Sequence, residues 1–333
     1  MSSTNTPETL VDVSFFTEKI NRTLSTLPYG ENPPELYDPI RYIMQLGGKR
    51  IRPLLTLLSA HLFGDEVDTV VKPALATEVF HNFTLLHDDI MDQAPIRRGK
   101  PTVHEKWNAN IAILSGDVML VRAYELFLDV EPAQLPRVLR LFSQCAAQVC
   151  EGQQLDMNFE TQAKVSIDDY LAMIRLKTAA LLGFCLELGA VLGGAGEEDA
   201  EHLRQFGIDL GIAFQLQDDL LDVYGEEHKF GKRVGGDILS HKKTFLLLTA
   251  LEQADDRQHQ VLQQWRHAGP EESDARVAAV TEVYDQLRVR EQTEEQIGYY
   301  SKEAYTHLTQ VQAPAERKEL LFGLARQVMT RDK

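Results

Sequence analysis

The sequence is short of the features that mark disulfide-bonded, metal-clustered or nucleic-acid-binding proteins. Its 333 residues contain three cysteines, Cys145, Cys150 and Cys185, an odd number without the spacing of metal ligands. That usage favours a reducing compartment. The net charge is -16, and no basic stripe offers the counterion release that drives binding to a nucleic-acid backbone. Nucleic acid is therefore excluded as the main partner.

Two further absences concern export and membranes. The N-terminal residues show no basic segment followed by an apolar one, and no uninterrupted apolar run reaches the length that spans a bilayer. We therefore expect a cytoplasmic protein without stable membrane insertion. Such a protein can still act on a hydrophobic substrate.

Runs that alternate apolar and polar residues are also absent, whereas apolar residues recur at helical spacing in nearly every long segment. This pattern predicts an all-α fold, a single large bundle of ten or more helices over residues 1–333 with short connections. Several predicted helices are apolar nearly all round, which is typical of the interior of a bundle. The charged segment from Val277 onward predicts a peripheral pair of helices.

Two D-D-x-x-D motifs follow apolar helical runs. They consist of Asp88, Asp89 and Asp92, and of Asp218, Asp219 and Asp222. In each motif the first and last carboxylates lie four residues apart on one helix face, with the middle one about 100° round. Negative charges there repel one another and oppose the helix dipole, so we expect a divalent cation among them. Magnesium suits the position because it bridges one or two carboxylates to substrate phosphates.

Basic residues suited to a phosphate ligand accompany these motifs. Arginine offers a planar fork to phosphate oxygens, whereas lysine acts as a compact charge. An unpaired ammonium is costly inside an apolar helix, so we expect Lys177 to have an anionic partner. The full set is Lys49, Arg50 and Arg52, then Arg97, Arg98 and Lys100, and the single lysines Lys177, Lys232 and Lys242.

In this order the motifs resemble those of the trans-type isoprenyl diphosphate synthases, also called the polyprenyl synthetase family. The resemblance runs from about Tyr37 to Ala250 and rests on "GGKRIRP", "HNFTLLHDDIMD", "RRGKPTVH", "EGQQLD", "KTAALLG", "FQLQDDLLD" and "GKRVGGD" with "HKKT". It implies a bundle of the isoprenoid synthase type around a deep apolar central cavity, and a homodimer. It also implies a prenyltransferase that joins isopentenyl diphosphate to dimethylallyl, geranyl or farnesyl diphosphate, with three magnesium ions when substrate is bound.

The resemblance implies roles position by position. The metal ligands would be Asp88, Asp89, Asp92, Asp156, Asp218, Asp219 and Asp222. Isopentenyl diphosphate would be held by Lys49, Arg52, His81 and Arg98, and the allylic diphosphate by Arg97, Lys177, Thr178, Gln215, Lys232 and Lys242. The residues expected to carry catalysis are Asp88, Asp92, Lys177, Asp218 and Lys232. One departure is His241, where the family often has glycine.

The implied reaction is ionisation of an allylic carbon–oxygen bond. Fixed cations stabilise the charge that develops on the departing diphosphate. The allylic cation is then attacked by the double bond of isopentenyl diphosphate, and the departed diphosphate is the expected proton acceptor. Apolar helices would shield the cation from water and house the growing chain.

Product length would depend on the helix that leads into the first motif. Phe83 lies five residues before Asp88, about 7.5 Å below it, where a large ring can form a floor. One aromatic at Phe83, a small Thr84 and no insertion in "DDIMD" resemble synthases that make geranylgeranyl diphosphate (C20). Farnesyl diphosphate (C15) is the alternative, and Phe80 can shift the floor.

Two more distant functions are a class I terpene cyclase and a noncatalytic helical partner subunit. A cyclase needs no second diphosphate site, and a noncatalytic subunit can lose one aspartate motif; this chain keeps both motifs and "GGKRIRP". A zinc site is rejected because His87, His104 and His228 lack ligand spacing. Lone polar residues such as His81 and Gln215 usually hydrogen-bond within a bundle, so their ligand roles depend on the resemblance.

Overall fold

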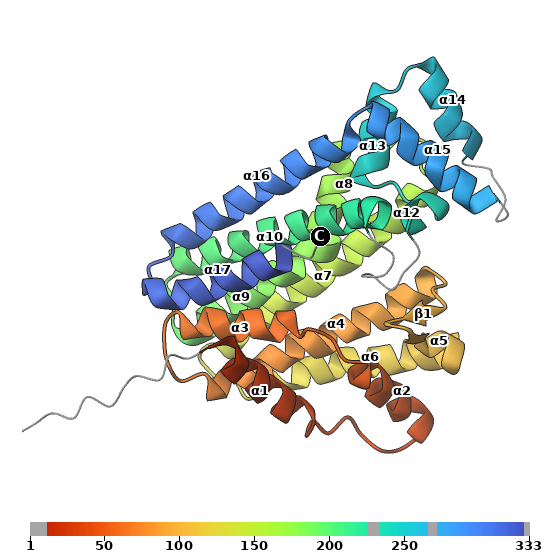
Figure 1. Ribbon diagram of the computed structural model, residues 1–333. Coiled ribbons are helices and arrows are strands. Elements are labelled where there is room, and N and C mark those ends of the chain that lie inside the picture. The colour runs from red at the N-terminus through yellow and green to blue at the C-terminus, as the bar shows by residue number, and fades with distance from the viewer. Residues whose placement is uncertain (1–11, 226–233, 266–271, 330–333) are drawn as a thin grey trace, which may run out of the picture.

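The structure is a computed structural model that describes residues 12–225, 234–265 and 272–329 (Figure 1). The predicted all-α fold is confirmed, since the described residues form helices and one two-stranded hairpin. The first half contains α1 (Val13–Leu24), α2 (Pro34–Gln45), α3 (Ile51–His61), the 3₁₀ turn Asp68–Val70, α4 (Val71–Met91), β1 (Ile96–Arg97), β2 (Lys100–Pro101), α5 (Val103–Lys106), α6 (Ala109–Glu125) and α7 (Leu135–Thr161). The second half contains α8 (Ile167–Ile174), the π-helical turn Arg175–Ala179, α9 (Ala180–Gly193), α10 (Glu197–Tyr224), α12 (Gly236–Leu239), α13 (Phe245–Gln253), α14 (Asp256–Trp265), α15 (Ser273–Gln286), α16 (Val289–Gln310) and α17 (Ala315–Met329).

Several helices begin at a polar side chain that accepts from their first free backbone N–H groups. Asp12 accepts from the Ser14 nitrogen at 2.8 Å to open α1, and Asn108 accepts from the Ile111 nitrogen at 2.9 Å to open α6. Ser166 and Asp169 form a reciprocal capping box at α8. Gly47 and Gly48 separate α2 from α3, and both residues have positive φ.

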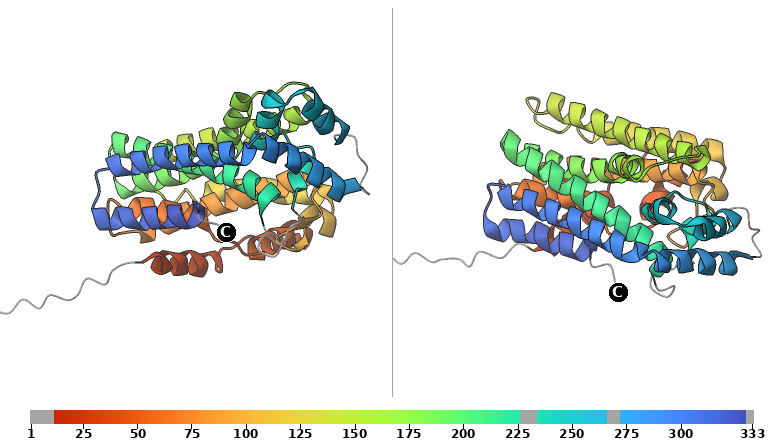
Figure 2. Two further views of the ribbon diagram at one scale, coloured as in Figure 1. Left: turned by 45° about the horizontal axis from the view of Figure 1, so that its top comes forward. Right: turned by 90° about the horizontal axis from the view of Figure 1, so that it is seen from above.

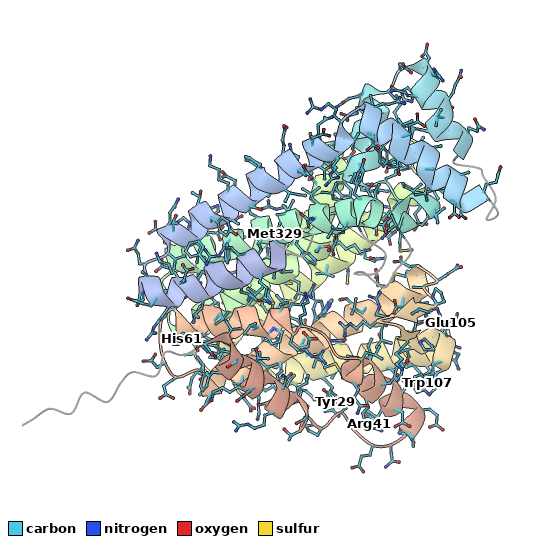
Figure 3. The ribbon with its side chains drawn as sticks, viewed as in Figure 1. Tyr29, Arg41, His61, Glu105, Trp107 and Met329 are labelled. Atoms are coloured by element: carbon cyan, nitrogen blue, oxygen red, sulfur yellow. The ribbon has the colours of Figure 1, made fainter. Side chains whose placement is uncertain are left out.

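The interior of the bundle is built on α3 and α9, as their apolar sequences predict. All residues from Pro53 to His61 of α3 are buried. A Cβ on Gly189 of α9 would lie 2.2 Å from the carbonyl oxygen of Thr56, so glycine allows the two helices to cross closely. His61, labelled in Figure 3, ends α3. Its carbonyl accepts from Arg317 of α17 at 2.7 Å.

Two hydrophobic clusters make up the core of the described residues. The larger contains side chains of α1 to α4, α6, α7, α9, α16 and α17, and the smaller lies under α8, α12, α13 and α15, with α10 contributing to both. The long helices lie side by side in the two turned views (Figure 2). In Figure 1, α4 and α10 end at the same side of the molecule, which brings the two aspartate motifs to one end of the bundle.

The charged C-terminal segment differs from the predicted peripheral pair. It forms three helices, α15 to α17, and α16 packs along α10, where Ala304 and Leu308 are fully buried. Small and apolar residues spaced along the inner face of α16 account for the difference, because the dense charges on its outer face hide this stripe in the sequence.

One described stretch, Ile167–Gly193, is long and apolar enough to cross a membrane by length and composition alone. Arg175 and Lys177 interrupt it, which is why the sequence shows no unbroken apolar run. In the structure, 61% of its apolar window is buried inside the protein, as a core helix requires.

The π-helical turn Arg175–Ala179 interrupts this stretch and lies against two glycines. A Cβ on Gly152 of α7 would lie 2.2 Å from the backbone nitrogen of Lys177, and a Cβ on Gly211 of α10 would lie 2.6 Å from the Cα of Ala179. π-Turns often occur at functional sites. Here the turn gives Lys177 and Thr178 their direction, and the two glycines allow it to sit between α7 and α10.

The first prediction concerns this close approach. Gly152→Ala should lower the free energy of unfolding by about 1–3 kcal/mol, because the methyl group meets backbone atoms that cannot rotate away. Gly298→Ala is the matched control, since Gly298 lies in α16 with nothing within 4 Å of its added Cβ, and should be neutral or stabilising by up to about 1 kcal/mol. Urea denaturation measures both; equal effects of the two substitutions would contradict the role given to Gly152.

Candidate active site

A cavity of about 640 Å³ opens between α4, α7, the π-turn and α10. Its polar wall includes many residues that the sequence singled out: Arg52, His81, Asp88, Asp92, Arg97, Asp156, Lys177, Thr178, Gln215, Asp218, Asp219 and Lys242. Its apolar wall includes Phe83, Leu85, Val149, Met157, Leu181 and Phe214. Segments more than 150 residues apart in the sequence thus meet around one space.

Five of the predicted residues lie elsewhere. Lys49, Asp89, Arg98, Asp222 and Phe80 do not line this cavity, and Lys232 lies outside the described residues. Asp89, Arg98 and Asp222 instead hold neighbouring segments in place, as described below.

The first aspartate motif is tied to the π-turn by a lysine. Lys177 Nζ lies 2.6 Å from Asp156 Oδ2 of α7 and 3.2 Å from Asp88 Oδ1 of α4. Burial lowers the pKa of Lys177, but these two carboxylates outweigh burial and raise it overall. Burial and the charge of Asp88 both raise the pKa of Asp92. The lysine therefore stays charged and balances the carboxylates, as the sequence predicted for a buried ammonium.

Asp89 faces away from Asp88 and binds an arginine. It is 2% exposed, and Arg97 Nε donates to its two oxygens at 2.8 and 2.9 Å. Arg97 comes from β1, and the turn residues Arg98 and Gly99 have φ of +52° and +72°, as a tight two-residue hairpin turn requires. Asp89 therefore fixes the hairpin, and with it Arg97, at the rim of the cavity.

The second aspartate motif is held by side chains from α8 and the π-turn. Tyr170 donates to Asp219 Oδ2, and Gln215 Nε2 donates to Asp219 Oδ1 at 2.9 Å. Thr178 donates to Gln215 Oε1 at 3.0 Å. Burial, with the nearby charge of Asp237, raises the pKa of Asp219 to about 8. This chain of hydrogen bonds links the π-turn to α10.

Asp222 caps the short helix that follows. Its Oδ2 accepts from the backbone nitrogen of Asp237 at 2.8 Å, at the start of α12. Lys242 follows α12 and points back to the acidic rim. Burial lowers the pKa of Lys242, but the charges of Asp237, Asp156, Asp92 and Asp219 raise it overall. The charge of Lys242 therefore offsets carboxylates of both motifs, whereas Lys177 pairs with Asp88 of the first motif and with Asp156.

His241 keeps the backbone shape that glycine would take. Its φ is +58°, in the left-handed region that glycine occupies without strain. Its imidazole contacts Arg276 of α15, with Arg276 Nη2 2.8 Å from His241 Nδ1. The histidine at this position therefore adopts a backbone conformation that glycine also allows.

A group of arginines from the start of α3 and from the hairpin gathers near His81 of α4. Arg50 is structural: it has a φ of +49°, and its guanidinium donates to Glu78 at 2.5 Å and to the Met44 carbonyl at 2.6 Å. Arg52, two residues later, reaches the cavity, and its Nε is buried with no hydrogen-bond partner in the described chain.

His81 lies beside this group. Burial, then the positive charges of Arg52 and Arg98, lower the pKa of His81 well below its usual value, so its ring is neutral. Arg98 donates to the Gly47 carbonyl, and its guanidinium lies over Gly48, 3.2 Å from the place of a Cβ. These buried cations repel one another, and they outnumber the carboxylates that pair with them. Such a group is suited to bind an anionic ligand.

Aromatic rings form the floor of the cavity. The Phe83 ring lies 5.6 Å from that of Phe80 and 4.8 Å from that of His87. Phe80 is fully buried one layer below and packs on Phe142 at 5.1 Å. Thr84 lines the cavity, and its hydroxyl donates to the His81 carbonyl at 2.8 Å. Phe83 and Thr84 therefore meet the space directly, whereas Phe80 supports them from beneath.

Sequence reasoning missed three residues that shape the site. Glu78 holds Arg50, Tyr170 holds Asp219, and Arg276 contacts His241. A glutamate inside the apolar run before the first motif was a detectable signal, because a buried carboxylate needs a cation. Tyr170 and Arg276 gave no signal, since both partners lie far away in the sequence.

The carboxylates at the rim fit magnesium. They are hard oxygen donors from α4, α7 and α10. Asp88 Oδ1 is buried beside Lys177 Nζ, 3.2 Å away, and accepts no hydrogen bond from the described residues. Among the described residues, no three His, Cys, Asp or Glu side chains converge on one point. Magnesium does not require such a cage, because it usually keeps waters and shares its remaining positions with substrate phosphates.

Comparisons with known proteins agree with this geometry. Residues 33–285 match the polyprenyl synthetase family. A geranylgeranyl diphosphate synthase of Methanosarcina mazei is 43% identical over 222 residues, covering 66% of this chain and 68% of that one. A geranylfarnesyl diphosphate synthase of Aeropyrum pernix is 36% identical over 309 residues, covering 90% and 96%. A crystal structure of a geranylgeranyl pyrophosphate synthase, 41% identical, superposes with a TM-score of 0.92 over 97% of this chain and 100% of the other. The protein therefore belongs to the polyprenyl synthetase family.

Proposed function

We propose that the protein joins isopentenyl diphosphate to an allylic diphosphate and releases geranylgeranyl diphosphate. The observation that carries this proposal is the single cavity in which an acidic rim with lysines, a group of arginines and an aromatic floor meet. The rim suits a diphosphate that must leave, the arginines suit a second anion, and the floor suits a growing apolar chain. The named relatives support the same reaction class.

The allylic diphosphate would lie between the two aspartate motifs. Magnesium, when bound with it, supplies positive charge that stabilises the departing group. Lys177 and Lys242 stay protonated because of the carboxylates around them, so they can bind the diphosphate oxygens as charge develops there. Arg97, fixed by Asp89, adds a planar donor at the same rim. Lys232 has the same proposed role.

Isopentenyl diphosphate would lie beside this group of arginines. Arg52 and His81 line the cavity, and the charge of Arg98 acts on both of them. Lys49, three residues before Arg52 in the sequence, has the same proposed role. A diphosphate would relieve the repulsion among these cations. Among the described residues, the charge of Glu78 raises the pKa of Arg98, whereas the charges of the neighbouring arginines lower it. Both diphosphates would lie in the one cavity, with their carbon chains meeting above Phe83.

The proposed assembly is a homodimer. Leu114, Val121 and Leu128 lie seven residues apart on and just after α6, so they share one face, and they are 58%, 56% and 62% exposed. Ile113 extends this face. A second copy of the chain is the partner that such a repeated apolar stripe fits, because a twofold interface pairs a patch with itself.

The second prediction concerns the metal rim. Asp88→Ala and Asp218→Ala should each lower kcat/KM by at least about 10²-fold, and EDTA should abolish turnover, because the departing charge loses its support. Asp129→Ala is the control, since Asp129 pairs with Lys72 on the surface, and it should keep normal rates. Circular dichroism checks folding; near-normal rates in both rim variants would rule out this mechanism.

The third prediction separates the two substrates. Arg52→Ala should raise the KM for isopentenyl diphosphate about tenfold or more, because a charge-assisted hydrogen bond contributes about 1.5–3 kcal/mol. Lys177→Ala should instead raise the KM for the allylic substrate and lower kcat. Initial rates with each substrate varied in turn measure both effects. An equal change in KM for both substrates in both variants would show that the two substrate sites are assigned wrongly.

The fourth prediction concerns product length. Phe83→Ala should give products longer than those of the parent, because it opens the space above Phe80 and Phe142. Thr84→Phe should shorten them to C15 or less, because a ring would fill the cavity from the same helix face. Chromatography of dephosphorylated products measures length, with farnesyl diphosphate as the alternative parent product. An unchanged distribution in both variants would place the floor elsewhere.

A further inference from the structure

A second cavity lies beside the first, under the smaller hydrophobic cluster. Its volume is about 780 Å³, and it is bounded by α8, α10, α12, α13, α14 and α15. Of these helices, α13, α14 and α15 lie at the upper right of Figure 1. Its walls are mainly apolar and include Val223, Ile238, Leu248, Leu251, Leu262 and Val280. Cavities of this size with apolar walls and a few polar groups are typical of ligand sites.

One buried arginine lacks an acidic partner at this cavity. Arg276 is 5% exposed and lines the wall. It donates to the Ile238 carbonyl and contacts His241, and within the described residues no carboxylate forms an ion pair with it. Burial lowers the pKa of Arg276, and no charged group among the described residues offsets that effect. A buried cation without a counter-ion is costly, so the site is suited to an anion.

The carboxylates in the same wall have other roles. Asp169 accepts from Ser166 in the capping box of α8. Asp237 acts on Lys242, whose pKa it raises. Glu252 is exposed. Among the described residues, none of these carboxylates therefore forms an ion pair with Arg276.

The two cavities share a wall. Lys242, Lys243 and Thr244 line both of them. His241 lines only the second, with Arg276 beside it, and the next residue, Lys242, reaches the acidic rim of the first. A ligand that contacts His241 and Arg276 would therefore act on the backbone that carries Lys242.

We propose that the second cavity binds an isoprenyl phosphate, with its anionic head at Arg276 and His241 and its chain along the apolar wall, and that occupancy lowers turnover through Lys242. The identity of this ligand rests on the proposed function, since the product has this chemistry. A fatty-acid anion shares the general chemistry of an apolar chain with an anionic head. The phosphate is preferred because an arginine fork matches phosphate oxygens, and the adjacent imidazole adds a second polar contact.

The test measures binding stoichiometry on the full chain with magnesium. Equilibrium dialysis with geranylgeranyl monophosphate should find two molecules per chain in the parent and one in Arg276→Met. Arg276→Met should keep its thermal midpoint, because it replaces a buried unpaired cation by a side chain of similar length. Arg257→Met, on the exposed face of α14, is the matched control and should still bind two.

A second variant keeps the test independent of that substitution. His241→Gly preserves the left-handed backbone and should keep kcat/KM within about twofold, while its second binding event weakens and inhibition by added monophosphate is lost. One molecule per chain in the parent, or two tight sites in both variants, would overturn the proposal.

The source of the ligand is tested by competition. Palmitate should displace the second monophosphate only at concentrations at least about tenfold higher; equal affinity would overturn the assignment to an isoprenyl phosphate. Turnover of isopentenyl and allylic diphosphates is measured in the same samples. Absent turnover would contradict the proposed function, whereas normal turnover with a single binding site would contradict this inference alone.

Discussion

The repulsion among carboxylates at one end of the bundle is the constraint on which the site depends. α4, α7 and α10 bring Asp88, Asp156 and Asp218 to one cavity, where burial would oppose so many negative charges. Lys177 and Lys242 offset that repulsion in the protein alone. A metal–diphosphate complex can offset it in their place, and the lysines are then free to bind the diphosphate itself.

The surrounding architecture serves to place these two lysines. Gly152 and Gly211 leave room for the π-turn that carries Lys177, and Asp222 anchors the short helix that leads to Lys242. Asp89 and Asp219, the middle residues of the two motifs, are buried and hydrogen-bonded away from the other carboxylates. In the first motif, Asp88 and Asp92 line the cavity while Asp89 holds the hairpin. In the second motif, Asp218 and Asp219 line the cavity while Asp222 caps α12.

Much of this could be predicted from the sequence because the signals are local. Helical spacing predicted the all-α fold, and the four-residue separation of Asp88 and Asp92 predicted that both would face one space. Lys177 in an apolar helix predicted an acidic partner, which is Asp156 together with Asp88. The π-turn could not be predicted, because it depends on a glycine of another helix.

Long-range pairs were equally hidden. Tyr170 meets Asp219 and Arg276 meets His241 only after α8, α10 and α15 have packed, so no spacing in the sequence reveals them. Asp89 and Arg97 were both identified, but as ligands of metal and substrate; their mutual contact depends on the hairpin turn at Arg98 and Gly99. Residue type thus indicated the chemistry, whereas the pairing followed from tertiary packing.

The central claim is that the lysines balance the aspartates until metal and diphosphate arrive together. Isothermal titration of magnesium into the protein, with and without a saturating allylic thiolodiphosphate that cannot ionise, tests it most directly. The account predicts weak magnesium binding to the protein alone and affinity at least about tenfold higher with the diphosphate present, because phosphate oxygens complete the coordination. Tight magnesium binding that is independent of the diphosphate would contradict it.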